Sequence, residues 1–222
     1  MLRGSATALA VTLGCASLTW AAVGLTTERM TTTSVVKALS SCGYTLSNPA
    51  KRVALPLTGG KAPTRPYTVT LDTSMGDVVF ESFSSDAPCA TNSFVHLARQ
   101  GYYNDSACHR VSTRHIFVLE CGDPAGKGVA DPGYYFKDEN LAGATYDAGT
   151  VAMSKVIPGR NGSQFFLSYA DPEVRMPPAW TPFGRVVKGL EVLKLIGANG
   201  TRNGSSDGIP KQPVVIESVT VR

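Results

Sequence analysis

The feature that most constrains the fold is a series of short β-type segments between residues 66 and 222. The segments are rich in Val, Ile, Thr and Phe, several alternate between apolar and polar residues, and Gly, Pro, Asn or Asp separate them. Alternation with a period of two places successive side chains on opposite faces of a strand. The predicted strands are residues 67–73, 78–83, 108–111, 116–121, 150–153, 164–168, 183–187 and 214–221.

Two stretches of the same region have the features of α-helices. In the first, Asp86 can cap the helix, Pro88 suits the first turn and Gly101 ends it. The second covers residues 189–197. The apolar stripes are Ala90, Phe94 and Leu97 in the first helix and Leu190, Leu193 and Ile196 in the second. Many short strands with two separate helices predict a mainly β protein, a closed eight-stranded antiparallel β-barrel capped by two α-helices.

The composition supports one folded domain with an extension. The chain has 222 residues, of which 43% are hydrophobic and 17% are charged, which is typical of a globular protein. The net charge of +4 comes from scattered Lys and Arg residues that form no basic run. We therefore expect no binding of nucleic acid.

The N-terminal region differs from the rest of the chain. Residues 4–27 contain no charged residue and follow Arg3, which is the layout of a signal peptide or a membrane anchor covering residues 1–27. Lipidation at Cys15 and a buried helix of the domain are the alternatives. Residues 28–65 are rich in Pro, Gly and Thr and predict an extended linker. The expected location is therefore outside the cytoplasm, in the cell envelope, either membrane-anchored or secreted.

The cysteines agree with export. Apart from Cys15, four remain, and an even number in an exported chain indicates two disulfides with three possible connectivities. One of these joins Cys108 to Cys121 across a hairpin and Cys42 to Cys89, and the other two stay open. The spacing of the cysteines fits no common zinc site, so no metal is expected.

Two segments carry the most distinctive side chains. Cys108 to Val111 places the permanent cation of Arg110 on a predicted strand, and Asn161 to Phe166 places two adjacent aromatic residues after a polar turn. In an extended chain the two Phe side chains point in opposite directions, so only one of them can face the core. A guanidinium facing an apolar wall suits the binding of a peptide carbonyl or a prolyl nitrogen.

At these residues the chain resembles the cyclophilins, a family of peptidyl-prolyl cis-trans isomerases. Four blocks of the family pattern occur in order: His109-Arg110, Gly122-Asp123, Asn161 to Phe166, and Phe183-Gly184. The resemblance covers residues 66–222 and implies a cyclophilin-like isomerase domain. It implies cis-trans isomerisation of X-Pro bonds without a cofactor. Because the N-terminal region predicts export, the expected substrates are exported or envelope polypeptides, and we expect a monomer.

The resemblance also implies the site residues. Arg110 matches the catalytic arginine, which would stabilise the prolyl nitrogen as the amide twists. Phe117 and Val118 match the floor of an apolar proline pocket, and Phe166 and Met176 match its walls. Phe165 is then expected in the core. The other expected substrate-binding residues are Glu120, Ser154, Lys155, Gln164 and Trp180. Ser154 and Lys155 replace an Ala-Asn pair whose backbone holds the peptide in the family.

Several positions depart from the family pattern. Glu120 stands where Gln is usual, and its carboxylate is expected to pair with Arg110 and to compete with the substrate for it. Two additional residues lie between Arg110 and Phe117, which predicts a different loop over residues 112–115. Trp180 replaces a His, and Arg175 replaces a Trp associated with cyclosporin, so weak binding of that drug is expected.

Two other interpretations of the site are possible. A hydrolase built on Ser163 or Cys108 with His109 would need a nucleophile elbow and an acidic partner, which the sequence lacks. His109 is instead expected to point away from Arg110 into the barrel as a core residue. The second alternative is a proline-peptide-binding chaperone module with little or no turnover, which the Glu120 substitution favours.

Overall fold

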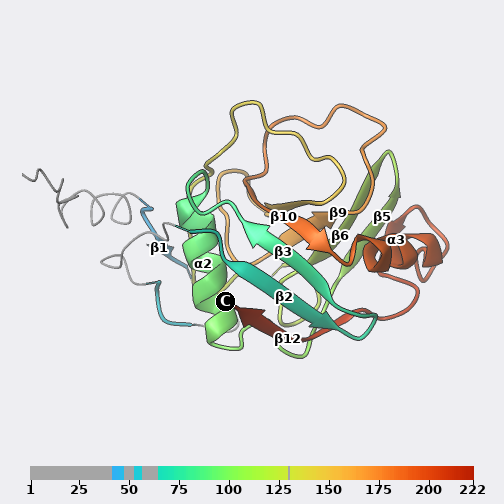
Figure 1. The fold of residues 1–222 in the computed structure, drawn as a ribbon, viewed down its shortest axis with the longest axis horizontal. Coiled ribbons are helices and arrows are strands. Elements are labelled where there is room, and N and C mark those ends of the chain that lie inside the picture. Colours follow the sequence, from blue (N-terminus) through green and yellow to red (C-terminus); the bar gives the residue numbers. More distant parts are fainter. Residues whose placement is uncertain (1–41, 48–52, 57–64, 130) are drawn as a thin grey trace, which may run out of the picture.

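The computed structural model describes residues 42–47, 53–56, 65–129 and 131–222. It shows a mainly β protein in which a curled sheet lies between two α-helices (Figure 1). The predicted signal peptide or anchor, residues 1–27, lies outside the described residues, as do Cys15 and much of the predicted linker. Neither helix in the described part of the chain is long and apolar enough to cross a membrane.

All eight predicted strands are present. They are β2 (Thr68–Thr73), β3 (Val78–Ser82), β5 (Arg110–Arg114), β6 (Ile116–Cys121), β8 (Thr150–Met153), β9 (Phe165–Ser168), β10 (Pro182–Lys188) and β12 (Val215–Val221). Four further strands have two residues each, which is too short for a period of two to be visible in a sequence. These are β1 (Thr45–Leu46), β4 (Ser106–Ala107), β7 (Tyr134–Tyr135) and β11 (Asp207–Gly208).

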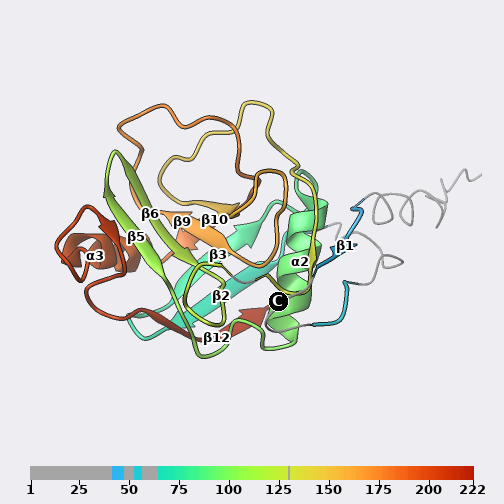
Figure 2. The ribbon, with the colours of Figure 1, turned by 180° about the vertical axis from the view of Figure 1, so that it is seen from behind.

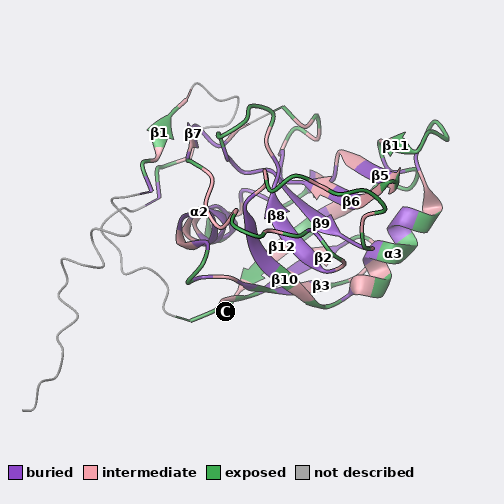
Figure 3. Ribbon diagram, turned by 90° about the horizontal axis from the view of Figure 1, so that it is seen from above, coloured by how far each residue is buried: buried purple, intermediate pink, exposed green. Residues whose placement is uncertain are grey.

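The main sheet corrects the predicted strand count. It has ten strands in the order β11-β5-β6-β9-β8-β10-β3-β2-β12-β4, and all neighbouring pairs are antiparallel. Among the described residues, the end strands β11 and β4 do not pair with each other, so the predicted closed eight-stranded barrel is replaced by a curled ten-stranded sheet (Figures 1 and 2). β1 and β7 form a separate two-stranded sheet at the end of the molecule that carries α2 (Figure 3).

An aromatic cluster fills the space inside the curled sheet. Phe94 of α2 packs against Phe80, Tyr103, Phe165 and Phe183, with ring centroids 4.9–5.4 Å apart. All five side chains are buried, which confirms that Phe165 belongs to the core. Aromatic residues bury large apolar areas, so this cluster provides much of the driving force that holds the helix on the sheet.

The two helices form as the sequence indicates, with one difference at a helix end. The helices are α2 (Pro88–Arg99) and α3 (Leu190–Asn199), and they cover opposite ends of the sheet (Figure 1). The N-cap of α2 is Ala87, so the prediction that Asp86 caps this helix is wrong. The carboxylate of Glu139 takes that role from a distant loop and accepts a 2.6 Å hydrogen bond from the backbone N–H of Ala90.

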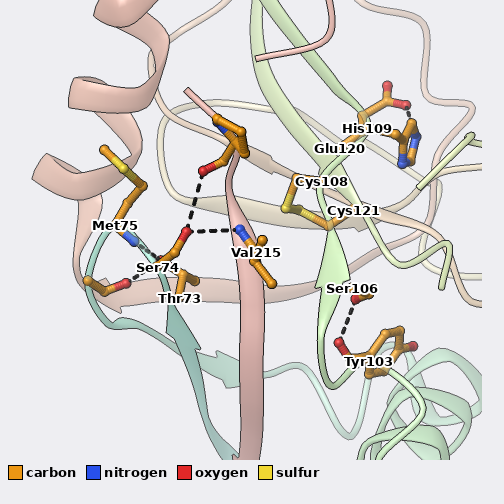
Figure 4. The surroundings of a disulfide bond; sticks show 12 residues. Thr73, Ser74, Met75, Tyr103, Ser106, Cys108, His109, Glu120, Cys121 and Val215 are labelled. Atoms are coloured by element: carbon orange, nitrogen blue, oxygen red, sulfur yellow. Dashed lines mark hydrogen bonds and ion pairs between the residues drawn. A yellow bond between two sulfur atoms is a disulfide. The ribbon is translucent and has the colours of Figure 1, made fainter. Parts of the chain in front are cut away.

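The disulfides follow the pairing expected from the hairpin. Cys108, two residues before β5, bonds to Cys121, the last residue of β6 (Figure 4). Cys42 bonds to Cys89 and attaches the segment before the domain to α2. Both pairs of sulfur atoms are buried together with the hydrophobic core.

The hairpin of β5 and β6 differs from its predicted form. Residues 112–114 continue β5, and the chain reverses at His115, where φ is 65°. The predicted loop over residues 112–115 is therefore mostly strand. Ser112 is buried despite its polar side chain, and its backbone lies opposite Asp207 of β11. Figure 2 shows the hairpin beside α3.

Replacement of Glu139 by Gln should remove a pH-dependent loss of stability. Burial raises the pKa of Glu139 to about 7, against the hydrogen bonds from the backbone of Ala90 and Cys89. Because the folded protein binds this proton more tightly than the unfolded chain does, protonation of Glu139 adds to the free energy of unfolding. This contribution is complete below the ordinary pKa of 4.5 and is lost as the pH rises towards 7. Between these two pH values, the wild-type free energy of unfolding should fall by about 2 kcal/mol relative to Glu139→Gln.

Urea unfolding at a series of pH values measures this difference. Gln keeps the acceptor oxygen for Ala90 but cannot ionise. The control is Glu217→Gln at an exposed position of β12, which should follow the wild-type profile. Parallel profiles for wild type and Glu139→Gln would contradict the prediction.

Candidate active site

The pairing of four neighbouring strands places the key residues in one row. Arg110 of β5 lies opposite Glu120 of β6, Glu120 lies opposite Phe166 of β9, and Phe166 lies opposite Ala152 of β8. Residues directly opposite each other on antiparallel strands point to the same face of the sheet. The guanidinium, the carboxylate and the aromatic ring therefore share one face, and Phe165 points to the other.

An apolar cluster lies on the same face as this row, and we call it the site cluster. Val118, Tyr146, Ala152 and Phe166 form its buried part. Its partly buried members are Ile116, Ala144, Met176 and Trp180. The structure therefore brings together Val118, Phe166, Met176 and Trp180, as the sequence predicts.

Phe117 is not part of the site cluster. It packs against the main core and contacts Tyr169, with ring centroids 5.9 Å apart. The prediction that Phe117 forms the pocket floor beside Val118 is therefore wrong. Adjacent residues of a strand point to opposite faces, and the face of Val118 is the one that also carries Glu120.

The floor of the predicted proline pocket is covered in this structure. Phe166 is 2% exposed and Val118 is 3% exposed. Trp180 lies across the cluster, with its ring centroid 6.4 Å from that of Phe166 and 5.7 Å from that of Tyr146. The Tyr146 hydroxyl donates a 2.8 Å hydrogen bond to the Trp180 carbonyl and accepts one of 2.9 Å from the Trp180 N–H. The predicted preformed pocket is thus a closed apolar cluster.

Two carboxylates hold Arg110. Its Nη1 pairs with Glu120, as expected, and its Nη2 and Nε pair with Asp207 of β11, the Nε at 2.9 Å. Burial lowers the pKa of the guanidinium, but the hydrogen bond to Asp207 and the charge of Glu120 outweigh it and raise the pKa overall. The cation is therefore permanent and fixed in direction.

Glu120 is the centre of the polar part of the row. Besides Arg110, its carboxylate accepts a 3.3 Å hydrogen bond from the Ser154 hydroxyl, and its Oε2 lies 3.6 Å from Nε2 of His109 (Figure 4). Burial raises the pKa of Glu120, but the contacts with His109 and Arg110 lower it more, so the pKa lies below its usual range. At neutral pH the side chain is a carboxylate that pairs with Arg110.

His109 is buried as expected, but its direction differs from the prediction. It faces Glu120, on the side of Arg110, rather than the interior of the sheet. His109 precedes the first residue of β5, so the alternation of side chains along a strand does not apply to it. Its ring packs so closely against Gly128 that a Cβ atom there would lie 2.6 Å from His109 Cδ2.

The backbone of Ser154 and the side chain of Lys155 have different roles. The Ser154 N–H donates a 2.8 Å hydrogen bond to the Gln164 carbonyl. The Lys155 side chain is only 6% exposed, and its ammonium pairs with Asp138 and donates to the Ala179 carbonyl. The ammonium thus joins three loops instead of facing a substrate.

A separate cavity lies beside Ser154 and Gln164. It has a volume of about 150 Å³. Its lining includes the Asn161–Phe166 motif through Gly162, Ser163 and Gln164. Because Ser154 also bonds to Glu120, the cavity is next to the row that carries Arg110.

Asp207 and Tyr146 are site residues that sequence reasoning missed. Asp207 is 97 residues from Arg110 and lies in a polar segment with no apolar pattern. Tyr146 lies in a long loop, where no periodicity indicates the direction of a side chain. Nothing local in the sequence points to either contact. In the described part of the chain, no group of His, Cys, Asp or Glu side chains is arranged to hold a metal ion.

Comparison with known proteins identifies the family. Residues 68–221 match the family described as cyclophilin type peptidyl-prolyl cis-trans isomerase/CLD. The chain is 37% identical to the probable peptidyl-prolyl cis-trans isomerase B of Mycobacterium tuberculosis over 198 residues, which cover 81% of this chain and 63% of that protein. The M. leprae protein of the same name is also 37% identical, with 81% and 66% covered. The chain thus spans less than two thirds of these two relatives.

Shorter relatives and a solved structure agree. Peptidyl-prolyl cis-trans isomerase CYP18-2 of Arabidopsis thaliana is 37% identical, with 62% of this chain and 85% of that protein covered. A cyclophilin type peptidyl-prolyl cis-trans isomerase of Cryptosporidium parvum has a TM-score of 0.62 and 27% identity, covering 71% of this chain and 98% of its own. The chain therefore belongs to the cyclophilin-type peptidyl-prolyl cis-trans isomerase family.

Proposed function

We propose that this protein catalyses the cis-trans isomerisation of X-Pro peptide bonds in exported or envelope polypeptides. The observation that carries the proposal is the row in which Arg110 and Phe166 share one face of the sheet. The relatives named as isomerases support the same activity. A crystal structure of the C. parvum isomerase in the presence of the dipeptide Ala-Pro has a TM-score of 0.61 to this chain.

The chemistry that the site must assist is rotation about a single bond. Resonance gives the peptide C–N bond a rotational barrier of about 18–20 kcal/mol. At the top of the barrier the amide is twisted, and the prolyl nitrogen becomes a better hydrogen-bond acceptor. A donor that binds this state more strongly than the planar state accelerates the rotation, by about tenfold for each 1.4 kcal/mol.

Arg110 can supply that donor while both carboxylates hold it. A guanidinium has five N–H groups. The contacts with Glu120 and Asp207 use Nε, Nη1 and Nη2, and each Nη atom carries a second hydrogen. The two carboxylates fix the orientation of the planar guanidinium, so little conformational entropy is lost when its remaining N–H groups bind a substrate.

The site cluster is the place for the proline ring. Phe166, Val118 and Met176 offer an apolar surface next to Arg110. Because the cluster is closed, partly buried members such as Met176 and Trp180 must move before the ring reaches Phe166. We assign the binding of the peptide main chain to Ser154 and Gln164, which are hydrogen-bonded to each other beside Glu120.

A location outside the cytoplasm completes the proposal. Two disulfides stabilise the chain, and disulfides persist mainly in oxidising compartments. The uncharged residues 4–27 would provide the signal peptide, membrane anchor or lipidation site. Mass spectrometry of the mature N-terminus distinguishes these three, and an intact cytosolic protein with reduced thiols would contradict export.

The alternative function is a proline-peptide-binding chaperone module with little turnover. The double engagement of Arg110 by Glu120 and Asp207 and the closed site cluster favour it. A protein that binds an X-Pro peptide but does not accelerate its isomerisation would establish this alternative.

Substitution of Arg110 should abolish most of the catalysis. Arg110→Lys keeps the positive charge but loses the rigid fork, so kcat/KM in a protease-coupled X-Pro assay should fall by about 100-fold. Arg114→Lys, at the exposed end of the same strand, is the matched control and should keep wild-type activity. Equal activity of both variants would show that the fork at residue 110 has no catalytic role.

Neutralisation of Glu120 should raise the rate. Glu120→Gln removes the charge that competes for Arg110, while Asp207 still orients the guanidinium. Because partly exposed ion pairs are worth less than about 1 kcal/mol, we expect an increase in kcat of about threefold. Glu81→Gln, exposed on β3, is the control. An unchanged or lower rate in Glu120→Gln would refute the competition between Glu120 and the substrate.

A further inference from the structure

A segment that precedes the family-matched residues is attached firmly to the domain. We call residues 42–47 and 53–56 the strap. The strap is joined to α2 by the Cys42–Cys89 disulfide, and the Tyr44 hydroxyl donates a 2.9 Å hydrogen bond to the Cys89 carbonyl. The Tyr44 ring packs edge-on against Tyr134 and Phe136, at centroid distances of 5.4 and 5.6 Å. One end of the strap is thus fixed covalently and by packing. Figure 3 shows its strand β1 beside β7.

The other end of the strap binds the loop at residues 131–133. The Ser47 N–H donates to the Gly133 carbonyl at 2.9 Å, and the Val53 N–H donates to the Pro132 carbonyl at 3.1 Å. The Ser47 hydroxyl donates to Asp131 Oδ1 at 2.6 Å, and the same oxygen accepts the Gly133 N–H at 2.8 Å. Four hydrogen bonds therefore fix this loop.

The loop in turn packs against the Asn161–Phe166 motif. A Cβ atom added to Gly162 would lie 3.2 Å from Pro132 Cδ and 3.3 Å from Asp131 Cβ, so the two backbones are in close contact. Only Ser163 separates Gly162 from Gln164, which the family resemblance places at the peptide. A continuous set of contacts thus runs from the strap to the substrate-binding side of the motif.

The cavity beside Gln164 is the end point of these contacts. Ser47 and Asp131 line it together with Ser154 and Gln164. Its volume of about 150 Å³ is smaller than the several hundred Å³ of a whole-ligand site and suits one amino-acid side chain. Three aliphatic residues at the cavity are highly exposed, at 70%, 63% and 51%, namely Val129, Val156 and Ile157.

We propose that the strap is a specificity-determining part of the substrate site. Ser47 and Asp131 set the width of the cavity, which receives a large apolar side chain of the peptide close to its X-Pro bond, and the exposed aliphatic residues cover that side chain. This inference rests on the proposed function of the neighbouring row. It assigns a substrate-selecting role to residues outside the family-matched region 68–221.

The comparisons are consistent with a strap shared by some relatives. The similarity to the M. tuberculosis protein covers 81% of the chain, which is more than residues 68–221 can supply, so it extends into the residues before the domain. The similarity to the A. thaliana protein covers 62% of this chain, which residues 68–221 are long enough to supply.

The test narrows the cavity from the strap side in the full-length chain. Ser47→Phe places a ring at the cavity wall, and Leu46→Phe places the same ring at an adjacent strap position that is 61% exposed and does not line the cavity. The probes are X-Pro peptides in which each position flanking the X-Pro bond is Gly, Leu or Phe in turn. Dissociation constants come from NMR titration, and isomerisation rates come from NMR exchange.

We expect wild type and Leu46→Phe to bind the best Leu or Phe peptide about tenfold more tightly than its Gly counterpart. Ser47→Phe should lose this preference through the dissociation constant, with the bound-state isomerisation rate of the Gly peptide unchanged. The Cys42→Ala, Cys89→Ala double variant, which releases the strap, should show a reduced preference as well. A purely structural role of Ser47 would weaken the binding of all peptides equally.

The outcomes separate this inference from the proposed function. A size preference in wild type that Ser47→Phe leaves intact would overturn the inference, even if the protein is an active isomerase. The absence of any size preference in wild type would overturn it too. Size-selective binding that depends on Ser47 in a wild type without isomerase activity would uphold the inference and overturn the proposed function.

Discussion

The register between β5, β6 and β9 is the constraint on which the rest of the site depends. It aligns Arg110, Glu120 and Phe166 across three strands. Because side chains alternate along a strand, a shift of one residue would exchange the polar row with the core residues beside it. The aromatic core on the opposite face resists such a shift, since it would expose Phe165 and bury Glu120. The stability of the core and the geometry of the site are therefore set by the same pairing.

The site combines a fixed cation with a closed apolar surface. Arg110 is held by carboxylates from two different strands, and Trp180 packs edge-on against the buried ring of Phe166. Both features reduce the freedom of the empty site, the first by fixing the direction of the donor and the second by excluding water from the cluster. A substrate therefore gains from the orientation of the cation but must first open the site cluster.

Much of the fold could be predicted, because strands and helices leave local periodic patterns. The strands around Arg110 and Phe166 and the stripe of α2 follow from such patterns. The predicted role of Phe117 is wrong because it follows the family motif alone. Side chains alternate along a strand, so Phe117 and its neighbour Val118 lie on opposite faces of the sheet. Asp207 and Glu139 could not be predicted, since each acts on a group 49 or more residues away and no local pattern encodes that contact.

The disulfide between Cys108 and Cys121 has a consequence for how the hairpin can fail. One cysteine lies two residues before Arg110 and the other immediately after Glu120, so the covalent link closes the hairpin at the end that carries the ion pair. Thermal fraying of this hairpin must then begin at the opposite end, near His115. The turn can therefore unfold locally while the ion pair between Arg110 and Glu120 stays intact.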